Sequence, residues 1–488
     1  MPPLACLKTF CLIALLSAPC HDRLNAADWI PIFDGCSLEG WKAGENPDSL
    51  KVMDGAIVCD GPRAHLFYVG HVQDAQFKNF EFAADVLTSP GANSGIFFHT
   101  AFQEPGWPAQ GFEVQINNTH HGEGGYREMK KTGSLYGVRN IYRAVAKDDQ
   151  WFTMRIAVRA NRVTVHVNDL KTVEYVQPET VGAEGALGRG TFALQCHDPE
   201  SRVLFCNLKV RPLPDDLPAE PADLPIDPEH YNRLLALHSE NIPVIDLHTH
   251  LKGGLTIADV LQRFYRTGIN YGVAVNGGVG FPITNDAGIY AFRESLAGYP
   301  VFVALQAEGR EWIRLFSPDA VRQFDYVFTD ALTFTDDGGR RTRLWINNEV
   351  QVGDPDEFME MYVHRIVDIL DHEPIDIFVN PTFLPEVLAA DYDRLWTSAR
   401  MQKVIDAAVR NDIAVEINDR YRIPSVAFIQ LAKQRGARFT FGTNNGDRND
   451  LGYLGYALEV QKACDLGSQD FFVPGWRPSR ANLRAVNR

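Results

Sequence analysis

The sequence lacks any run of basic residues that could attract a polyanion. Its 47 lysines and arginines are outnumbered by 62 aspartates and glutamates, which gives a formal net charge of −15 over 488 residues. Nucleic acids and anionic membranes attract positive protein surfaces and repel negative ones. The charge therefore argues against both as partners and favours a small neutral molecule or a carbohydrate.

After its N-terminal segment, the chain also lacks the run of roughly 20 apolar residues that a membrane-spanning helix needs. The one apolar run that stands out, TFCLIALLSA, follows Lys8 and precedes the small pair Ala26-Ala27. A charged start, a short apolar core and small residues are typical of an export signal. We expect residues 1–27 to be a signal peptide, and the protein to be periplasmic or secreted with no integral membrane span.

Cysteines are few and show no framework spacing. Eight are present, and those beyond the predicted signal are Cys36, Cys59, Cys196, Cys206 and Cys464. An odd number without regular spacing favours buried free thiols over a disulfide scaffold. A bridge between Cys196 and Cys206 stays open as an alternative.

The first half of the chain is rich in short strand patterns. Residues 30–211 alternate or cluster β-branched and aromatic residues, with Gly, Asn, Asp or Pro between them, as in FKNFEFAADVLTS, SGIFFHTAF, GFEVQINN and WFTMRIAVRA. The stretch RANRVTVHVNDL predicts a hairpin and then a tight turn at Asn168-Asp169. Many short strands without helices favour an all-β sandwich.

A stretch rich in proline and aspartate, RPLPDDLPAEPADLPIDP, then interrupts every periodicity. Its composition predicts a stiff linker, which we place over residues 212–241. From 242 to 488, apolar strand patterns alternate with helical ones, which predicts a distorted (β/α)7-type barrel whose strand ends meet at one mouth. The polar residues at the predicted strand ends are His248, Asn276, Glu308, Asp330, Asn380, Glu416 and Asn444.

Two histidines close the first predicted barrel strand, in VIDLHTH. His248 and His250 are two residues apart and therefore leave a strand on the same face. Together with Glu308 they make two imidazoles and a carboxylate, enough for one catalytic metal with an open position. The alternatives are a structural histidine pair, or a mouth that binds a sugar through its amides and carboxylates.

The second half resembles the polymerase and histidinol phosphatase (PHP) barrel family over nearly its whole length. The matching residues are the DLHTH stretch, Glu308 in ALQAEGREW and the closing FTFGTNNGDRNDLGYL. The resemblance implies two or three metal ions and phosphate-ester hydrolysis. However, Asn276-Gly277, Asn380-Pro381 and the Thr443-Asn444-Asn445-Gly446 stretch stand where the family has Asp-His, His-Pro and Ser-Asp-Ala-His. Because neutral amides are weak ligands, we expect one divalent ion, zinc or manganese, on His248, His250 and Glu308, with Glu416 and Asp330 as further candidates, or none.

Residues 30–211 resemble the 3-keto-disaccharide hydrolase domain family, a jelly-roll relative of the concanavalin-like glucanases. The matching blocks, in order, are IFDGCSLEGWK, ANSGIFF, GFEVQ, TGSLYG, QWFTMRIAV, VNDLKTVEY, FALQ and VLFCN. The chain departs from the pattern at His99, where many relatives carry an arginine.

The resemblance implies cleavage of glycosides that are already oxidised to a ketone at C3. The ketone acidifies the C2 hydrogen, so that a base can remove it, an enolate forms and the C1–oxygen bond breaks. Water can then add back to give net hydrolysis. The route needs a general base, an acid for the leaving group and an electrophile at the ketone oxygen.

The candidate residues lie mainly on the predicted strands. Glu113 and Gln115 share one strand face, and Glu113 is the predicted base because an unpaired buried carboxylate is costly without a function. His197 or Tyr136 is the predicted acid. The predicted sugar-binding residues are His99, Gln115, Gln195 and Asn93. In other interpretations, Asn93-Ser94-Gly95 is only a turn, Gln195 binds a neighbouring strand, and His120 and His121 lie on a solvated loop or bind a metal.

We therefore predict an exported hydrolase or lyase that cleaves 3-keto-glycosides in its sandwich domain. In the alternative, the sandwich is a carbohydrate-binding module and the barrel is a metal-dependent hydrolase. A third hypothesis is a sugar-binding scaffold in which neither half catalyses.

Overall fold

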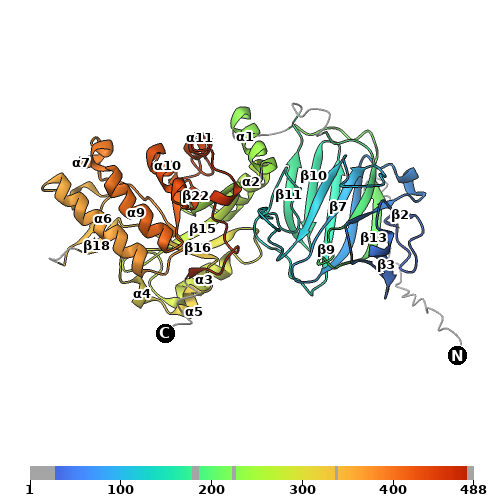
Figure 1. Ribbon diagram of the computed structural model, residues 1–488, viewed down its shortest axis with the longest axis horizontal. Helices are drawn as coiled ribbons and strands as arrows, with labels where there is room; N and C mark the ends of the chain where they lie inside the picture. The colour runs from blue at the N-terminus through green and yellow to red at the C-terminus, as the bar shows by residue number, and fades with distance from the viewer. Residues whose placement is uncertain (1–27, 179–185, 222–226, 336–338, 481–488) are drawn as a thin grey trace, which may run out of the picture.

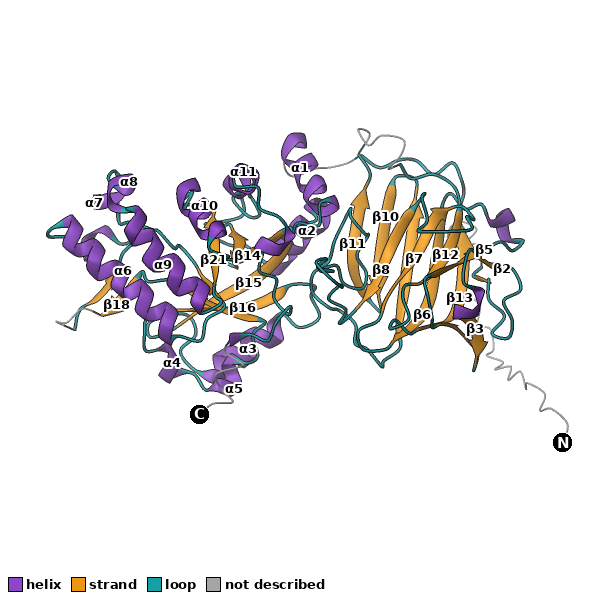
Figure 2. Ribbon diagram, viewed as in Figure 1, coloured by secondary structure: helices purple, strands orange, loops and turns teal. Residues whose placement is uncertain are grey.

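A computed structural model of the protein describes residues 28–178, 186–221, 227–335 and 339–480, so the predicted signal peptide lies outside the described residues. A sandwich of two antiparallel sheets lies beside a barrel of parallel strands (Figure 1). Strands make up most of the first body, whereas helices surround the second (Figure 2). In the described part of the chain, no helix is long and apolar enough to cross a membrane.

The sandwich confirms the predicted all-β domain. Its larger sheet has the order β11-β10-β9-β6-β13-β4-β3, with β1 paired to β13, and its smaller sheet has the order β2-β5-β12-β7-β8. The strands of the larger sheet are β1 (Ile30–Pro31), β3 (Leu50–Met53), β4 (Ala56–Cys59), β6 (Phe80–Thr88), β9 (Phe152–Arg159), β10 (Arg162–Val167), β11 (Leu170–Val176) and β13 (Val203–Pro212). Those of the smaller sheet are β2 (Trp41–Ala43), β5 (Ala64–Tyr68), β7 (Asn93–Thr100), β8 (Phe112–Asn117) and β12 (Thr191–Cys196).

Alternation along β8 decides which side chains are buried between the two sheets. Phe112, Val114 and Ile116 belong to the core. Because successive side chains of a strand point to opposite faces, Glu113 and Gln115 lie on the outer face of the smaller sheet. The strand pattern thus places a carboxylate outside the packed core.

Seven parallel strands close into a barrel in the order β14-β15-β16-β17-β20-β21-β22, and β14 pairs with both β15 and β22. These are the seven strands that the sequence predicts: β14 (Ile245–His250), β15 (Asn270–Gly277), β16 (Phe302–Ala307), β17 (Tyr326–Thr329), β20 (Ile377–Phe378), β21 (Ala414–Asn418) and β22 (Phe439–Gly442). A two-stranded sheet of β18 (Thr333–Thr335) and β19 (Arg341–Arg343) follows β17.

Helices of very different length connect and cover the barrel strands. They are α2 (Ile257–Thr267), α3 (Asp286–Ser295), α4 (Trp312–Leu315), α5 (Pro318–Val321), α6 (Pro355–His372), α7 (Glu386–Ala389), α8 (Tyr392–Leu395), α9 (Ser398–Arg410), α10 (Val426–Gln434) and α11 (Gly455–Ala463). The seven-stranded α/β barrel is therefore confirmed, and its PHP type stays a prediction.

One local prediction and two alternative interpretations need correction. The predicted linker contains helix α1 (Pro228–Ser239), which buries Tyr231 and Leu234. Proline is common in the first turn of a helix. Pro228 therefore starts α1, which Asp227 caps, and does not interrupt a helix. Asn93-Ser94-Gly95 is also not a turn, since it opens β7. The described cysteines are all free, so the alternative Cys196–Cys206 bridge does not form.

Aromatic packing at the centre of the sandwich gives a test of the fold. The ring of Phe192 lies 4.7 Å from the rings of Phe77 and Phe82 and 4.9 Å from that of Phe80. We expect Phe192→Ala to lower the free energy of unfolding by about 3–5 kcal/mol, because it opens a cavity in a closed core. Urea unfolding of the full chain measures this. Val387→Ala, at a position that is 68% exposed on α7, should change it by less than about 0.5 kcal/mol; similar losses in the two variants would contradict the packing described.

Candidate functional site

The outer face of the smaller sheet carries a cavity of about 470 Å³. Its walls come from strands β7, β8 and β12, and from the segments that precede and follow β8. The lining residues are Asn93, Phe97, Trp107, Pro108, Glu113, Gln115, His120, Gly122, Glu123, Tyr126, Glu128, Tyr136, Gln195 and His197. The structure therefore brings six of the seven catalytic and sugar-binding residues predicted for the sandwich into one cavity.

Glu113 lies where the neighbouring strand leaves room for it. A Cβ atom at Gly95 would come within 2.3 Å of Glu113 Oε1, so glycine there makes space for the carboxyl group. Gln195 Nε2 donates to the same oxygen at 3.3 Å. Burial, and next the Glu128 carboxylate, raise the pKa of Glu113 to about 8, while Lys130 opposes the rise. Once ionised, such a group is a stronger base than an ordinary carboxylate.

His197 follows β12 and is oriented by its neighbour in sequence. Its Nδ1 lies 2.6 Å from Asp198 Oδ2. Asp198 is fixed in turn by the backbone N–H of Glu200, at 2.8 Å, and by the hydroxyl of Ser201, at 3.1 Å. Because Nδ1 is engaged, Nε2 is the nitrogen that remains for a ligand in the cavity. The pair has the form of a general acid or base held by a carboxylate.

A cluster of tyrosine, glutamate and lysine forms another wall, and only Tyr136 of this cluster was predicted. The hydroxyl groups of Tyr126 and Tyr136 lie 2.9 Å apart, and Tyr126 donates to Glu128 at 3.1 Å. Lys130 Nζ donates to the Tyr126 hydroxyl at 2.9 Å and lies 3.2 Å from Glu128. Burial raises the pKa of Tyr136, so this residue keeps its proton at physiological pH. A tyrosine donor backed by a second hydroxyl group and a buried ammonium suits an oxygen that gains negative charge.

Amide side chains line the floor of the cavity beside Glu113. Gln115 Nε2 donates to Asn93 Oδ1 at 2.8 Å. Gln195 Oε1 is buried and has no hydrogen-bond partner among the described residues, so it is an acceptor left for a ligand hydroxyl group. The interpretation of Gln195 as a side chain that binds a neighbouring strand is not supported, since its Nε2 faces Glu113.

An aromatic wall faces this polar floor. Trp107 is 46% exposed, and its ring lies 5.3 Å from that of His197 and 5.4 Å from that of His65. Burial lowers the pKa of His65 to about 4, which keeps this imidazole neutral. An exposed indole beside neutral polar groups is a surface on which a sugar ring can stack. Neither Trp107 nor His65 is marked by a motif in the sequence.

His99 lies outside the cavity, which corrects its predicted place among the sugar-binding residues. Its Nε2 contacts the backbone oxygen of Lys78 at 2.9 Å, and its Nδ1 accepts from the N–H of Gly188 at 3.2 Å. The reason is local, because the backbone of His99 is left-handed with φ of +55°. A left-handed residue interrupts the alternation of the strand, so His99 does not continue the face on which Phe97 lines the cavity.

The two histidines of INNTHHGEGG are divided between the cavity and the barrel. His120 lines the cavity, and its Nδ1 lies 3.1 Å from the backbone oxygen of Gly91. The ring of His121 packs at 4.7 Å against Trp476, which follows the last barrel strand. The interpretation of INNTHHGEGG as a solvated loop is therefore not supported.

At the barrel mouth, the two predicted histidine ligands point to different partners. His248 Nδ1 lies 2.5 Å from Glu416 Oε1, whereas His250 Nδ1 lies 3.1 Å from the backbone oxygen of Ala274. Of these two rings, His248 still has an unpartnered Nε2 within the described residues. One open imidazole nitrogen does not by itself make a metal site.

The third predicted ligand is engaged as well. Glu308 accepts from Asn276 Nδ2 at 2.8 Å and from the Thr333 hydroxyl at 3.0 Å. Burial, and next the nearby Asp330, raise its pKa to about 8. In the part of the chain that the structure describes, no group of three or more His, Cys, Asp or Glu side chains is arranged to hold a metal ion. The residues present do not fit the predicted zinc or manganese ion.

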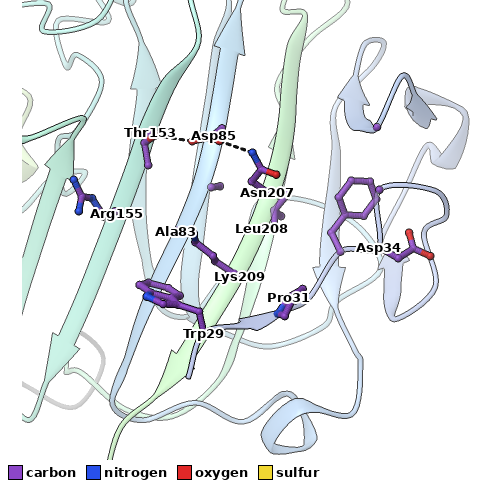
Figure 3. A pocket seen from close by; sticks show the side chains of 14 residues that line it. Trp29, Pro31, Asp34, Ala83, Asp85, Thr153, Arg155, Asn207, Leu208 and Lys209 are labelled. Atoms are coloured by element: carbon purple, nitrogen blue, oxygen red, sulfur yellow. Dashed lines mark hydrogen bonds between the residues drawn. The ribbon is translucent and has the colours of Figure 1, made fainter. Parts of the chain in front are cut away.

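A second hollow, of about 610 Å³, lies on the outer face of the larger sheet. Its polar centre is Asp85, which accepts from the Thr153 hydroxyl and from Asn207 Nδ2, each at 2.6 Å (Figure 3). Trp29 and Lys209 flank this group. The lining has no histidine, tyrosine or glutamate, so the acid and base pair that the predicted chemistry needs is found in the smaller cavity and not here.

Comparison with known families points to the same domain. The family model described as the 3-keto-alpha-glucoside-1,2-lyase-like domain matches residues 28–211. A 3-keto-disaccharide hydrolase of Bacteroides thetaiotaomicron is 28% identical over 178 residues, which cover 31% of this chain and 60% of that relative. The chain thus spans about 60% of the length of this curated relative. The resemblance predicted from the sandwich motifs is confirmed.

Solved structures also align with this region. A protein of Parabacteroides distasonis, named as a candidate glycosyl hydrolase, is 22% identical and aligns over 38% of this chain and 94% of its own, with a TM-score of 0.32. The carbohydrate-binding module CBM66 of Bacillus subtilis is 10% identical over 35% of this chain and 95% of its own, with a TM-score of 0.26.

The raised pKa of Glu113 predicts a pH-dependent cost to stability. Because the folded-state pKa of about 8 lies above the ordinary 4.5, folding favours the protonated group. The contribution of the protonated Glu113 carboxyl group to folding stability is fully present below pH 4.5 and is lost as the pH rises through 8. We therefore expect Glu113→Gln to gain stability relative to the parent protein as the pH rises over this range, measured as the difference in Tm.

Glu39→Gln provides the matched control, since Glu39 is an exposed residue of the same domain. Its Tm difference from the parent should stay constant with pH. A constant difference for Glu113→Gln as well would show that Glu113 titrates normally.

Proposed function

We propose that the sandwich domain cleaves 3-keto-glycosides by abstraction of the C2 proton. The observation that carries the proposal is the carboxyl group of Glu113, which has a raised pKa and lines an open cavity beside His197 and a pair of tyrosines. The family match of residues 28–211 supports this substrate class.

In the first step, ionised Glu113 takes the proton from C2, and the electrons of the C–H bond move towards the C3 ketone to give an enolate. Negative charge then develops on the C3 oxygen. The Tyr136 hydroxyl is the donor for this oxygen. The single hydroxyl proton of Tyr126 is directed to Glu128 or Tyr136, and the Lys130 ammonium polarises this hydroxyl from behind. Donors that are already oriented stabilise such charge without reorganisation.

In the second step, the enolate electrons expel the group at C1, and His197 gives a proton to the departing oxygen. Water then adds across the resulting C1–C2 double bond, with His197 taking a proton from the water and Glu113 returning one to C2. Both groups end as they began, so the net reaction is hydrolysis. Asp198 keeps His197 in one orientation throughout.

The remaining lining residues bind the sugar. Asn93, Gln115 and Gln195 offer amide groups to the hydroxyls, and Trp107 offers a ring face to a sugar ring. A small neutral carbohydrate also suits a chain with a net charge of −15. We place the reaction outside the cytoplasm, as the apolar N-terminal run favours.

Replacing the base tests the proposal. Glu113→Gln keeps the shape of the side chain but cannot accept a proton, so kcat on a 3-keto-glucoside should fall by about 10²–10⁴-fold. In the parent protein, kcat/KM should rise with pH as Glu113 ionises, since its base form is required and its pKa is raised to about 8. Steady-state release of the aglycone, measured between pH 5 and 9 on the same substrate, gives both quantities.

Glu39→Gln should retain the activity of the parent protein. Retained activity in Glu113→Gln would remove this residue from the reaction. A kcat/KM that does not rise with pH between 5 and 9 would contradict the role of Glu113 as the base.

A further inference from the structure

The segment between β8 and β9, residues 118–151, contributes to the cavity and to the junction between the domains. It pairs with the edge of the smaller sheet, where Gly133 N–H donates to the Gln115 oxygen and Tyr136 N–H donates to the Glu113 oxygen, each at 2.9 Å. The same segment supplies Tyr126, Glu128 and Tyr136 to the cavity. We call it the wall segment.

Lys130 connects this wall to the residue that precedes the barrel. It is only 1% exposed, and its ammonium group donates to Tyr126 and lies against Glu128. The third contact of Nζ is Asn241 Oδ1, at 2.8 Å. Asn241 Nδ2 in turn donates to the backbone oxygen of Arg127 at 2.9 Å. One amide thus binds the wall segment at two points.

Arg127 fixes the same segment to the closing part of the barrel. Its Nη1 donates to the backbone oxygens of Ser468, at 2.8 Å, and Phe471, at 3.0 Å. Its guanidinium group lies 4.4 Å from the ring of Trp476, the same ring against which His121 packs. The wall segment is therefore held by Arg127, which precedes Glu128, and by Lys130, which follows it.

Further contacts extend the junction away from the cavity. Asn140 Nδ2 donates to the His238 oxygen on α1 at 2.9 Å, and Asn270 Nδ2 on β15 donates to the Asn140 oxygen at 2.9 Å. These bonds join the wall segment to the first elements of the barrel domain. The docking of the two domains is thus built largely from the segment that also shapes the cavity.

Electrostatics makes the contact with Asn241 important. An ammonium group has three protons to donate, and here they meet a phenol, a carboxylate and the Asn241 amide. A buried charge that loses a partner is destabilised strongly unless water or a rearrangement restores it. Without Asn241, Lys130 would turn towards solvent and release Tyr126 and Glu128.

We infer that the barrel acts on the sandwich as a clamp, and that Asn241 and Lys130 are positioning residues which hold the tyrosine wall of the catalytic cavity in place. The contact network does not depend on the proposed function, whereas its effect on turnover rests on that function. In this arrangement the barrel needs no metal of its own to matter for the reaction.

Two substitutions of Asn241 in the full-length protein test the clamp. Asn241→Leu keeps the size of the side chain but accepts no hydrogen bond, whereas Asn241→Asp keeps an acceptor for Lys130. The first readout is amide hydrogen exchange of residues 118–136, which needs no substrate. We expect at least tenfold faster exchange in Asn241→Leu and a smaller increase in Asn241→Asp, which keeps the acceptor for Lys130 but loses the donor to the Arg127 oxygen.

The second readout is kinetic. Asn241→Leu should lower kcat at least tenfold with a smaller change in KM. The reason is that the wall segment stabilises the negative charge of the transition state more than it contributes to substrate binding. The rise of kcat/KM with pH should also move to higher pH, since Lys130 opposes the raised pKa of Glu113. Asn241→Asp should restore kcat to within a few-fold of the parent value. A merely structural role for Asn241 would not shift the pH profile.

Trp476→Ala provides a second variant, because it removes the stacking partner of Arg127 from outside the cavity. It should speed up exchange in the same residues, and the exposed control Asn449→Ala should not. Unchanged exchange of the wall segment in both Asn241→Leu and Trp476→Ala would overturn the clamp. If the parent protein cleaves no 3-keto-glucoside while exchange responds as expected, the clamp stands and the proposed function fails.

Discussion

The site depends on a carboxyl group that is held away from water but outside the hydrophobic core. Glu113 lies on the outer face of the smaller sheet, where Gly95 makes room for it and burial raises its pKa to about 8. A carboxylate between the two sheets would have no substrate to meet, and one in open solvent would be a weak base. The geometry avoids both outcomes because strand alternation fixes the face and the wall segment covers it.

Both domains are needed to make that environment. The sandwich supplies the floor, with its amides and Glu113, and the wall segment supplies the tyrosines and Lys130. The barrel then holds the wall segment through Asn241 and through the contacts of Arg127. A barrel whose mouth does not fit a metal can still serve the reaction through the surface that it offers to its neighbour.

The sequence predicts the parts of this account that follow from periodicity. The seven barrel strands and the outward face of Glu113 come directly from alternation and apolar runs. Tyr126 and Lys130 could not be predicted, because they lie in irregular backbone, where the spacing of residues does not fix the direction of their side chains. His99 failed for a related reason, since a left-handed residue breaks the alternation at the end of β7. The described residues at the barrel mouth do not fit the predicted metal ion, since no three His, Cys, Asp or Glu side chains are arranged there to hold one.

Cleavage of a 3-keto-glucoside in D₂O tests the central claim most directly, because abstraction at C2 leaves a label there. The account predicts that the released 3-keto sugar carries solvent deuterium at C2, detected by NMR and mass spectrometry. It also predicts faster incorporation than in the same sugar incubated without protein. Hydrogen fully retained at C2, together with no primary kinetic isotope effect for a substrate deuterated at C2, would contradict abstraction at C2 and would point to direct displacement at C1.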